Sequence, residues 1–467
     1  MSSKTVSLKE GKIVSIREVF DTSQFTSYQM LVCTLCFCVT FLDGFDLTVI
    51  GVALPKIADF LHAKPSALGL ALSAGQFGPL IGAIVLGTLA DRWGRKWMLS
   101  ISALIFGVFT LMTAFITSVE QLALLRFLAG LGLGGAVPNA LTFGSEYAPA
   151  RSRATFVTTM YAGMPAGATL GGLSAAWLIP HFGWQSLFIP GGGIPILIGL
   201  AVALLLPESL EFLVGQGKDD RRIREIVSRI SPALGRDEEV RFRSAEKKLP
   251  GVPVKHLFTQ GRAVMTVLLW AGLIGALYLL WILVSWAPTL LRKSGASVEQ
   301  YSIAYACLNF GAVVATICIG RLMDKANPYR VLQIGFVLGA LSLVTFGLCA
   351  GTGSFIVIAV LSVVCGFFIN GSSAGLLAAT TISYPVDIRG SGIGWAYAVS
   401  KVGAMAAPAM GGFLLTRAWT VSQICSTNAM VGFAVAAIIL ALQAYLAAVA
   451  RRTEKVEAQR VPAGEAA

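Results

Sequence analysis

The stretch Gly87-Thr88-Leu89-Ala90-Asp91-Arg92 decides the fold, because a close copy of it, Gly320-Arg321-Leu322-Met323-Asp324-Lys325, lies half a chain length further along. Both stretches have the pattern G-x-L-x-D followed by a basic residue, and each comes directly after a long apolar run. A motif that recurs at half the length of the chain indicates an internal repeat. We therefore expect the chain to contain two copies of one structural unit.

The composition is that of a protein embedded in a membrane. Of the 467 residues, 55% are hydrophobic and 13% are charged, and the mean hydropathy is +0.74. Soluble domains carry roughly 25% charged residues. A helix that crosses a hydrocarbon core of ~30 Å needs about 20 mostly apolar residues. The sequence holds twelve such runs, at residues 28–53, 68–90, 97–117, 121–147, 154–178, 184–206, 263–290, 300–320, 331–350, 354–382, 391–416 and 424–449.

These runs predict an all-α membrane protein in which twelve transmembrane helices form two six-helix halves. The central polar segment separates the sixth run from the seventh. Within it, Arg221 to Ile230 has basic and apolar residues at helical spacing, which predicts an amphipathic helix lying on the membrane surface. The expected segments are an N-terminal segment at 1–27, a six-helix half at 28–206, a central loop at 207–262, a second half at 263–450 and a tail at 451–467.

Basic residues gather on one side of the predicted membrane. If both termini are inside, most of the 36 Lys and Arg residues fall in inner segments, which the positive-inside rule associates with the cytoplasm. The net charge of +12 then reflects topology and contact with anionic lipid, and we expect no nucleic-acid partner. We expect a monomer that crosses the bacterial inner membrane several times, with both termini in the cytoplasm.

The sequence does not indicate an enzyme, a metal site or a cofactor. Gly130, Gly132 and Gly135 fit G-x-G-x-x-G, but a dinucleotide site requires a preceding strand, and these glycines lie inside a predicted span. Close packing of helices through small residues is the better interpretation. The cysteines lie in or at the ends of apolar runs and the histidines in loops, so neither group predicts a cluster of metal ligands.

Three charged residues lie at similar depth in the first half. A charge near the centre of a membrane helix costs roughly 2.5 to 3.5 kcal/mol on insertion scales, so each needs a partner or a function. Asp43 and Asp46 are three residues apart in the first span, and Arg126 lies in the fourth. We expect the acids to face Arg126 across a cavity, either as a static salt bridge or as a proton-coupling site. The sequence leaves open which acid carries the proton.

Lys401 lies ~15 Å into the eleventh span, close to the bilayer midplane. A cation at this depth indicates an anionic substrate, or else pairing with helix-end carbonyls or with Asp43 or Asp46. Aromatic and amide side chains on nearby spans would supply ring-stacking walls and polar contacts. The candidate substrate-binding residues are Lys401, Phe45, Trp395, Tyr397, Tyr278, Trp281, Tyr305 and Asn309.

A second repeated pattern lies on the predicted inner side. Pro149 with Arg153 and Pro385 with Arg389 share the spacing P-x-x-x-R, and acidic residues lie close to both. These charges predict a cytoplasmic latch that closes when the protein faces outward, the alternative being ordinary positive-inside charge. The candidate gating residues are Asp91, Arg92, Arg95, Glu146, Arg153, Asp324 and Arg389.

The motifs together resemble a known family. The stretch Gly87 to Lys96, and Arg126 with the glycines Gly130 to Gly135, resemble the major facilitator superfamily over essentially the whole chain. Within it, the chain is similar to the aromatic acid:proton symporters, which take up 4-hydroxybenzoate, protocatechuate, benzoate and related ring acids. The stretches that carry this similarity are Asp43-Gly44-Phe45-Asp46, Gly134-Gly135-Ala136-Val137-Pro138-Asn139 and Gly392-Ile393-Gly394-Trp395-Ala396.

The resemblance implies that Asp43, Asp46, Arg126, Glu146 and Arg389 fall at positions important for transport. The chain departs from the family at Lys401, where relatives commonly carry arginine, and at Tyr329, where some carry histidine. The first departure replaces a bidentate contact to a carboxylate with a point charge.

The function expected from these residues is proton-coupled symport that imports an aromatic carboxylate by alternating access. Two alternatives stay open. One is a symporter for another organic anion, such as a phthalate-like dicarboxylate or a sugar acid, and the other is a proton-driven exporter. A cation at the midplane and an acid pair in the first span argue against an exporter of cations.

Overall fold

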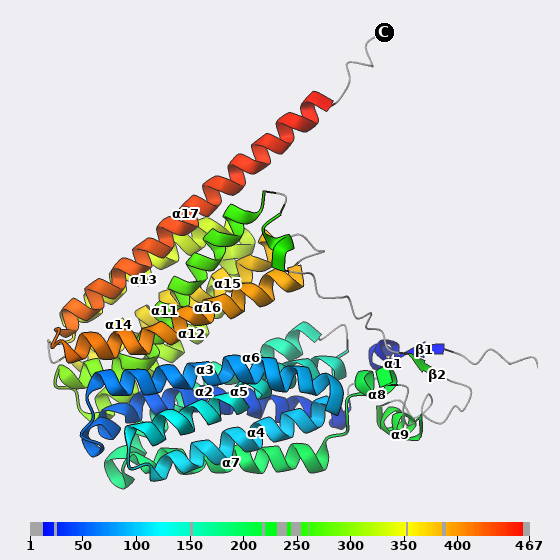
Figure 1. Ribbon diagram of the computed structural model, residues 1–467, viewed down its shortest axis with the longest axis horizontal. Coiled ribbons are helices and arrows are strands. Elements are labelled where there is room, and N and C mark those ends of the chain that lie inside the picture. The colour runs from blue at the N-terminus through cyan, green and yellow to red at the C-terminus, as the bar shows by residue number, and fades with distance from the viewer. Residues whose placement is uncertain are drawn as a thin grey trace, which may run out of the picture.

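A computed structural model describes residues 13–22, 26–149, 153–216, 220–230, 241–243, 254–259, 261–351, 354–384 and 389–460. Long helices account for most of this chain (Figure 1). The first half consists of α2 (Ser27–Phe60), α3 (Pro65–Trp93), α4 (Arg95–Met112), α5 (Val119–Tyr147), α6 (Arg153–Phe182) and α7 (Gln185–Leu205).

The second half repeats this arrangement. One of its helices is interrupted by a π-helical turn, η3 (Gly366–Asn370), between α14 and α15. The other members are α11 (Ala263–Lys293), α12 (Val298–Lys325), α13 (Pro328–Cys349), α14 (Phe355–Cys365), α15 (Gly371–Ser383), α16 (Arg389–Thr416) and α17 (Val421–Arg460).

The predicted number of spans agrees with these helices. Within the described ranges, eleven segments are long and apolar enough to cross a membrane, with α14, η3 and α15 forming one of them. The remaining long helix is α6, which has 30 residues and covers the predicted span at 154–178. The all-α fold with two sets of helices is therefore confirmed.

Within each half, glycines bring one pair of helices into close contact, and the pairs occupy equivalent places in the two halves. Gly44 of α2 and Gly167 of α6 lie so near the opposing backbone that a Cβ atom would collide with Met164 or Phe41. In the second half, Gly403 of α16 packs in the same way on Ile274 of α11. Gly130 of α5 lies against Pro79 of α3, which confirms the packing role expected for the glycine run in that span.

The two halves meet at one end of the bundle, which we call the closed end. Apolar residues of α2, among them Val49 and Val52, share a buried core with Leu283 and Trp286 of α11. An ion pair crosses the same boundary, with Arg292 Nη2 of α11 at 2.6 Å from Asp59 Oδ2 of α2. In Figure 1 the ribbons of the two halves separate toward the other end.

That other end, which we call the basic end, carries the turn between α3 and α4 and the segment after α7. A small unit is attached to it, made of β1 (Ile13–Ser15), α1 (Ile16–Thr22), α8 (Leu210–Gln216), α9 (Asp220–Ile230) and β2 (Arg241–Arg243). A 3-10 turn, η2 (Val254–Leu257), precedes α11. Strands β1 and β2 pair in parallel with Val14 opposite Phe242, so the segment before the first span folds together with the central loop.

The amphipathic helix predicted from Arg221 to Ile230 forms as α9, but its apolar face packs on protein. Its apolar side chains Ile223, Ile226, Val227 and Ile230 are buried in a protein core that includes Val19 and Phe20 of α1. An apolar face covered by protein is not available to enter a bilayer. The sequence of α9 alone does not reveal this, because its partner α1 lies some two hundred residues away.

Candidate functional site

A cavity of about 420 Å³ lies between the two halves. Side chains of α2, α3, α5 and α6 line it on one side, and side chains of α11 and α16 line it on the other. On α3 the lining continues from Leu72 to Ile84, in the direction of the basic end. Most of the wall is apolar, and its charged side chains are those of Asp43, Asp46, Arg126 and Lys401.

Asp46 and Arg126 form a buried ion pair at the wall of this cavity. Arg126 Nη1 donates to both carboxylate oxygens of Asp46, at 3.0 and 2.9 Å. The hydroxyl of Thr110 on α4 accepts from Arg126 Nη2 at 3.1 Å and donates to Asp46 Oδ1 at 3.2 Å. Both charged side chains are only 5% exposed, a condition under which a pair is stable only with such additional hydrogen bonds. The predicted approach of Arg126 to the acids is confirmed for Asp46.

Asp43 has a different environment, although it lies only three residues before Asp46. It lines the cavity, and among the described residues it takes part in no ion pair or hydrogen bond. Its charge interacts across the cavity with that of Lys401. Three residues on a helix are about 60° apart around its axis, since each residue turns it by about 100°. That angle is enough for the Asp46 carboxylate to reach Arg126 on α5 while the Asp43 carboxylate does not, although both residues line the cavity.

Lys401 reaches the cavity from α16. Its Nζ atom lies 4.8 Å from the centre of the Tyr397 ring, one helical turn earlier, in cation–π contact. Tyr397 lines the cavity as well, and Trp281 of α11 is the third of the predicted substrate-binding residues to do so. The described part of the chain offers Lys401 no ion pair, so its pairing with Asp43 or Asp46 is not present in this conformation.

The other five predicted substrate-binding residues lie outside the cavity. Phe45 is buried in the core, and Tyr305 donates its hydroxyl to the carbonyl of Val284 at 3.1 Å. Asn309 in turn donates to the carbonyl of Tyr305 at 2.9 Å. These five residues lie elsewhere because the cavity meets only one face of α2, α11 and α16 and none of α12, and Trp395 is 45% exposed. The five are Phe45, Trp395, Tyr278, Tyr305 and Asn309.

Two polar residues that line the cavity were not predicted. Gln76 projects from α3 and Ser285 from α11, so the two halves each contribute one neutral polar group. A signal for Gln76 was present, because a single amide inside an apolar run costs free energy unless it has a hydrogen-bonding partner. Serine is common in membrane helices, and the sequence around Ser285 carries no comparable signal.

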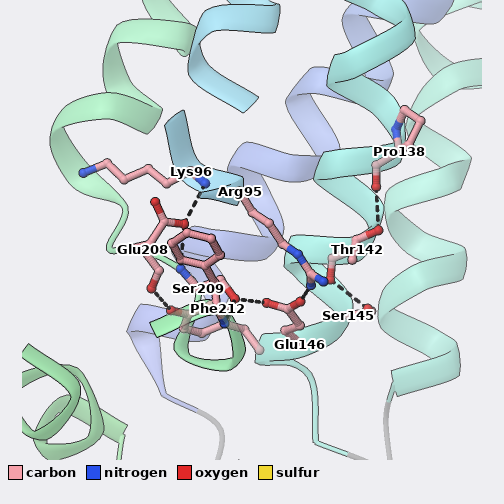
Figure 2. Close-up of polar contacts among 10 residues, drawn as sticks. Arg95, Lys96, Pro138, Thr142, Ser145, Glu146, Glu208, Ser209 and Phe212 are labelled. Atoms are coloured by element: carbon pink, nitrogen blue, oxygen red, sulfur yellow. Dashed lines mark hydrogen bonds and ion pairs between the residues drawn. The ribbon is translucent and has the colours of Figure 1, made fainter. Parts of the chain in front are cut away.

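A separate polar network lies at the basic end (Figure 2). Arg95 at the start of α4 forms an ion pair with Glu146 near the end of α5, and the Ser209 hydroxyl donates to the same carboxylate. Glu208 accepts from the backbone N–H groups of Lys96 and Ser209, each at 3.0 Å. Burial raises the pKa of Glu208, and these backbone donors offset part of that shift. The network links α4, α5 and the segment after α7.

The predicted gating residues are only partly brought together. Arg95 and Glu146 pair with each other inside the first half, whereas Arg92 and Asp324 are exposed at the basic end. The side chains of Asp91, Arg153 and Arg389 lie outside the described residues. Among the described side chains, none of the predicted gating residues forms an ion pair between the halves.

The family comparison covers nearly all of the two halves. The model of the Major Facilitator Superfamily matches residues 36–297 and again residues 269–467. Two structures of similar fold are a D-xylose-proton symporter, with a TM-score of 0.69 and 17% identity, and the inward-open xylose transporter of E. coli, with 0.68 and 18%. The first alignment covers 88% of this chain and 97% of the other, and the second covers 88% and 95%.

Relatives in sequence narrow the family further than the solved structures do. The 4-hydroxybenzoate transporter of Acinetobacter baylyi is 37% identical over 85% of this chain and 88% of its own. The gallate transporter of Pseudomonas putida is 33% identical over 92% and 95%, and the benzoate transport protein of Acinetobacter baylyi is 31% identical over 86% and 87%. With this degree of identity over nearly complete chains, and with the matching fold, the protein is a multi-pass membrane transporter that belongs to the major facilitator superfamily and, within it, to the family of the aromatic acid transporters.

Proposed function

We propose that the protein is a proton-coupled symporter that imports an aromatic carboxylate across the bacterial inner membrane. The observation that carries the proposal is the cavity that Asp43 and Lys401 share without forming an ion pair in the described chain. The names of the relatives support the substrate class, since they include transporters of 4-hydroxybenzoate, gallate and benzoate. We further propose a monomer whose basic end and termini face the cytoplasm.

The cavity fits a ring acid in size and chemistry. Its volume of about 420 Å³ lies within the ~300–1,000 Å³ of small-molecule sites. We assign the substrate carboxylate to Lys401 and the ring to the faces of Trp281 and Tyr397. Gln76 and Ser285 supply neutral groups that can bind ring hydroxyls. Phe45, Tyr278, Tyr305, Trp395 and Asn309 lie outside the cavity, so we assign them no direct contact with the ring acid.

Coupling follows from competition for Lys401. In the empty carrier, the negative charge of Asp43 offsets the positive charge of Lys401 across the cavity. When the substrate carboxylate binds Lys401, it neutralises the positive charge of the lysine in place of Asp43. The cavity then holds one negative charge too many, and a proton that binds Asp43 removes it. The loaded and the empty cavity then carry the same net charge. Asp46 is held by Arg126 and Thr110, so it orients Arg126 and has less freedom to exchange a proton.

Alternating access requires the closed end to open. We propose that the ion pair between Arg292 and Asp59 breaks at that step. At the basic end the Arg95–Glu146 pair is then free to exchange partners, joining Asp91, Arg92, Arg153, Asp324 and Arg389 in a latch between the halves.

Uptake by reconstituted protein tests the function. In proteoliposomes with an inward proton gradient, labelled 4-hydroxybenzoate should accumulate above its outside concentration, and a protonophore should abolish the accumulation. Benzoate and gallate should compete, whereas benzamide, which has the ring without the charge, should not. Stronger competition by a sugar acid or a dicarboxylate would overturn the aromatic substrate, and equal uptake without the gradient would overturn the coupling.

Topology reporters test the orientation. A reporter inserted after Lys248 in the central segment should behave as cytoplasmic, and one inserted after Lys64, between α2 and α3, as periplasmic. The two sites lie on opposite sides of the membrane under the proposal, so each serves as the control of the other. Exchanged signals would reverse the assignment of both ends.

A further inference from the structure

A second cavity, of about 300 Å³, lies at the basic end and is not part of the proposed transport path. Residues from α4, from the end of α7 with the segment that follows it, from α8 and from α9 line it. Its basic side chains are Lys96, Arg222 and Arg229, so two elements far apart in the sequence direct positive charge at one space.

The geometry of α4 and α9 accounts for this convergence. Arg222 and Arg229 are seven residues apart on α9, which is two helical turns, so both project from one face of the helix. Ile226 lies between them and lines the cavity as well, so this face borders the apolar face that packs in the protein core. Figure 2 shows the Lys96 side chain leaving α4 in the direction opposite to Arg95, away from the Arg95–Glu146 pair. Its Nζ lies 5.4 Å from the centre of the Trp97 ring.

The cavity lies where membrane-spanning helices end. Three of its lining residues are apolar and strongly exposed: Leu204 is 81%, Leu205 54% and Trp97 50% exposed. Side chains of this kind at the end of a spanning helix face the hydrocarbon and the interface, where tryptophan is enriched. The cavity therefore joins a basic site to a surface suited to acyl chains.

Two acids also line the cavity, but both are partly offset. Glu208 accepts backbone hydrogen bonds from Lys96 and Ser209 through its Oε1 atom, so this oxygen is already engaged by backbone donors. Glu225 lies 3.5 Å from Arg221 Nε on the same helix. The basic side chains of the cavity outnumber its acids, so the cavity favours an anion.

We propose that this cavity binds the phosphate of an anionic phospholipid, such as phosphatidylglycerol, from the membrane leaflet at the basic end. Arg222 and Arg229 contact the phosphate oxygens, for which guanidinium groups have matching geometry. Lys96 adds a point charge, and the acyl chains pass over Leu204 and Leu205. Helix α9 thus meets the membrane through its basic face, while its apolar face stays in the protein.

Lipid titration of the full chain in a neutral detergent, followed by native mass spectrometry, tests the site. Phosphatidylglycerol should bind, and phosphatidylcholine with the same acyl chains should bind at least about tenfold more weakly. The double substitution Arg222→Gln and Arg229→Gln should weaken phosphatidylglycerol binding by about tenfold or more. Glycerol 3-phosphate, which has the phosphate without the chains, should compete only at far higher concentration.

Two further variants make the result decisive. Arg224→Gln is the matched control: Arg224 lies on the same helix over the Phe242 ring, as Arg229 lies over the Tyr28 ring, but it does not line the cavity. It should leave binding unchanged. Glu225→Gln removes a negative charge from the cavity and should strengthen binding severalfold, an effect that misfolding cannot produce. Unchanged binding in the double variant, equal losses in Arg224→Gln, or equal competition by glycerol 3-phosphate would each overturn the lipid site.

Discussion

Replacing Lys401 by alanine should weaken binding of the ring acid by at least about tenfold, because it removes the positive charge assigned to the substrate carboxylate. Lys401 Nζ is the positive group of the second half that reaches the cavity in the described chain, and it has no ion-pair partner there that would limit its availability. Isothermal titration of the purified protein with 4-hydroxybenzoate measures the loss. A variant that binds as tightly as the original would show that the carboxylate binds elsewhere.

Two substitutions separate charge from packing at this position. Lys401→Met keeps most of the apolar stem, so it should lose affinity as Lys401→Ala does if the charge is responsible. Lys401→Arg should retain part of the affinity and alter the preference among ring acids, since a guanidinium binds a carboxylate through two parallel hydrogen bonds. The preference for benzoate over benzamide should disappear in the alanine and methionine variants and persist in the arginine variant.

The second large effect is expected at Asp43. Asp43→Asn should abolish accumulation driven by a proton gradient while substrate binding and counterflow exchange persist. A neutral amide imitates the protonated acid, so the substrate no longer has to bring a proton with it. Binding of the ring acid should also lose the part of its pH dependence that comes from protonation of Asp43. Proteoliposome uptake, counterflow and binding, the last measured over a series of pH values, give the three readouts.

Substitutions in the buried ion pair of Asp46 and Arg126 should have different effects from Asp43→Asn. Arg126→Ala leaves the carboxylate of Asp46 without its partner in a site that is 5% exposed, and breaking a buried pair in this way costs about 3–5 kcal/mol. We expect it to lower the thermal stability and to impair exchange as well as accumulation. Asp46→Asn should do the same to a smaller extent, because Thr110 still accepts from Arg126. If Asp43→Asn still accumulates substrate uphill, the proton moves through another group, and Glu146 is the next candidate.

The two carboxylates show how far reasoning from the sequence extends. Their depth in the first span, and the depth of Arg126, follow from counting residues along apolar runs, and the ion pair of Asp46 agrees with that count. Their separate environments do not follow, since a difference of about 60° around a helix axis decides which of the two carboxylates reaches Arg126 on α5. The partners of a side chain depend on which helices are its neighbours, and the hydropathy of the sequence does not predict those neighbours.

The aromatic residues illustrate the same limit. Eight candidates on four spans were compatible with a ring-binding site, and of these Trp281, Tyr397 and Lys401 line the cavity. Tyr305 and Asn309 instead satisfy hydrogen bonds between and within helices of the second half. An aromatic residue is as compatible with lipid or with another helix as with a ligand, so its type does not select among them.

The sequence by itself determined the all-α membrane fold, the internal repeat and the clustering of basic residues at one end. These properties add up along single segments, because an apolar run must satisfy its backbone hydrogen bonds internally when it enters lipid. Only the tertiary structure decided that Asp43 and Lys401 share a cavity and that α9 directs its apolar face to α1 and its basic face to a second cavity. Those outcomes depend on which faces of distant segments meet, and that is set by packing between helices and not by the composition of any one of them.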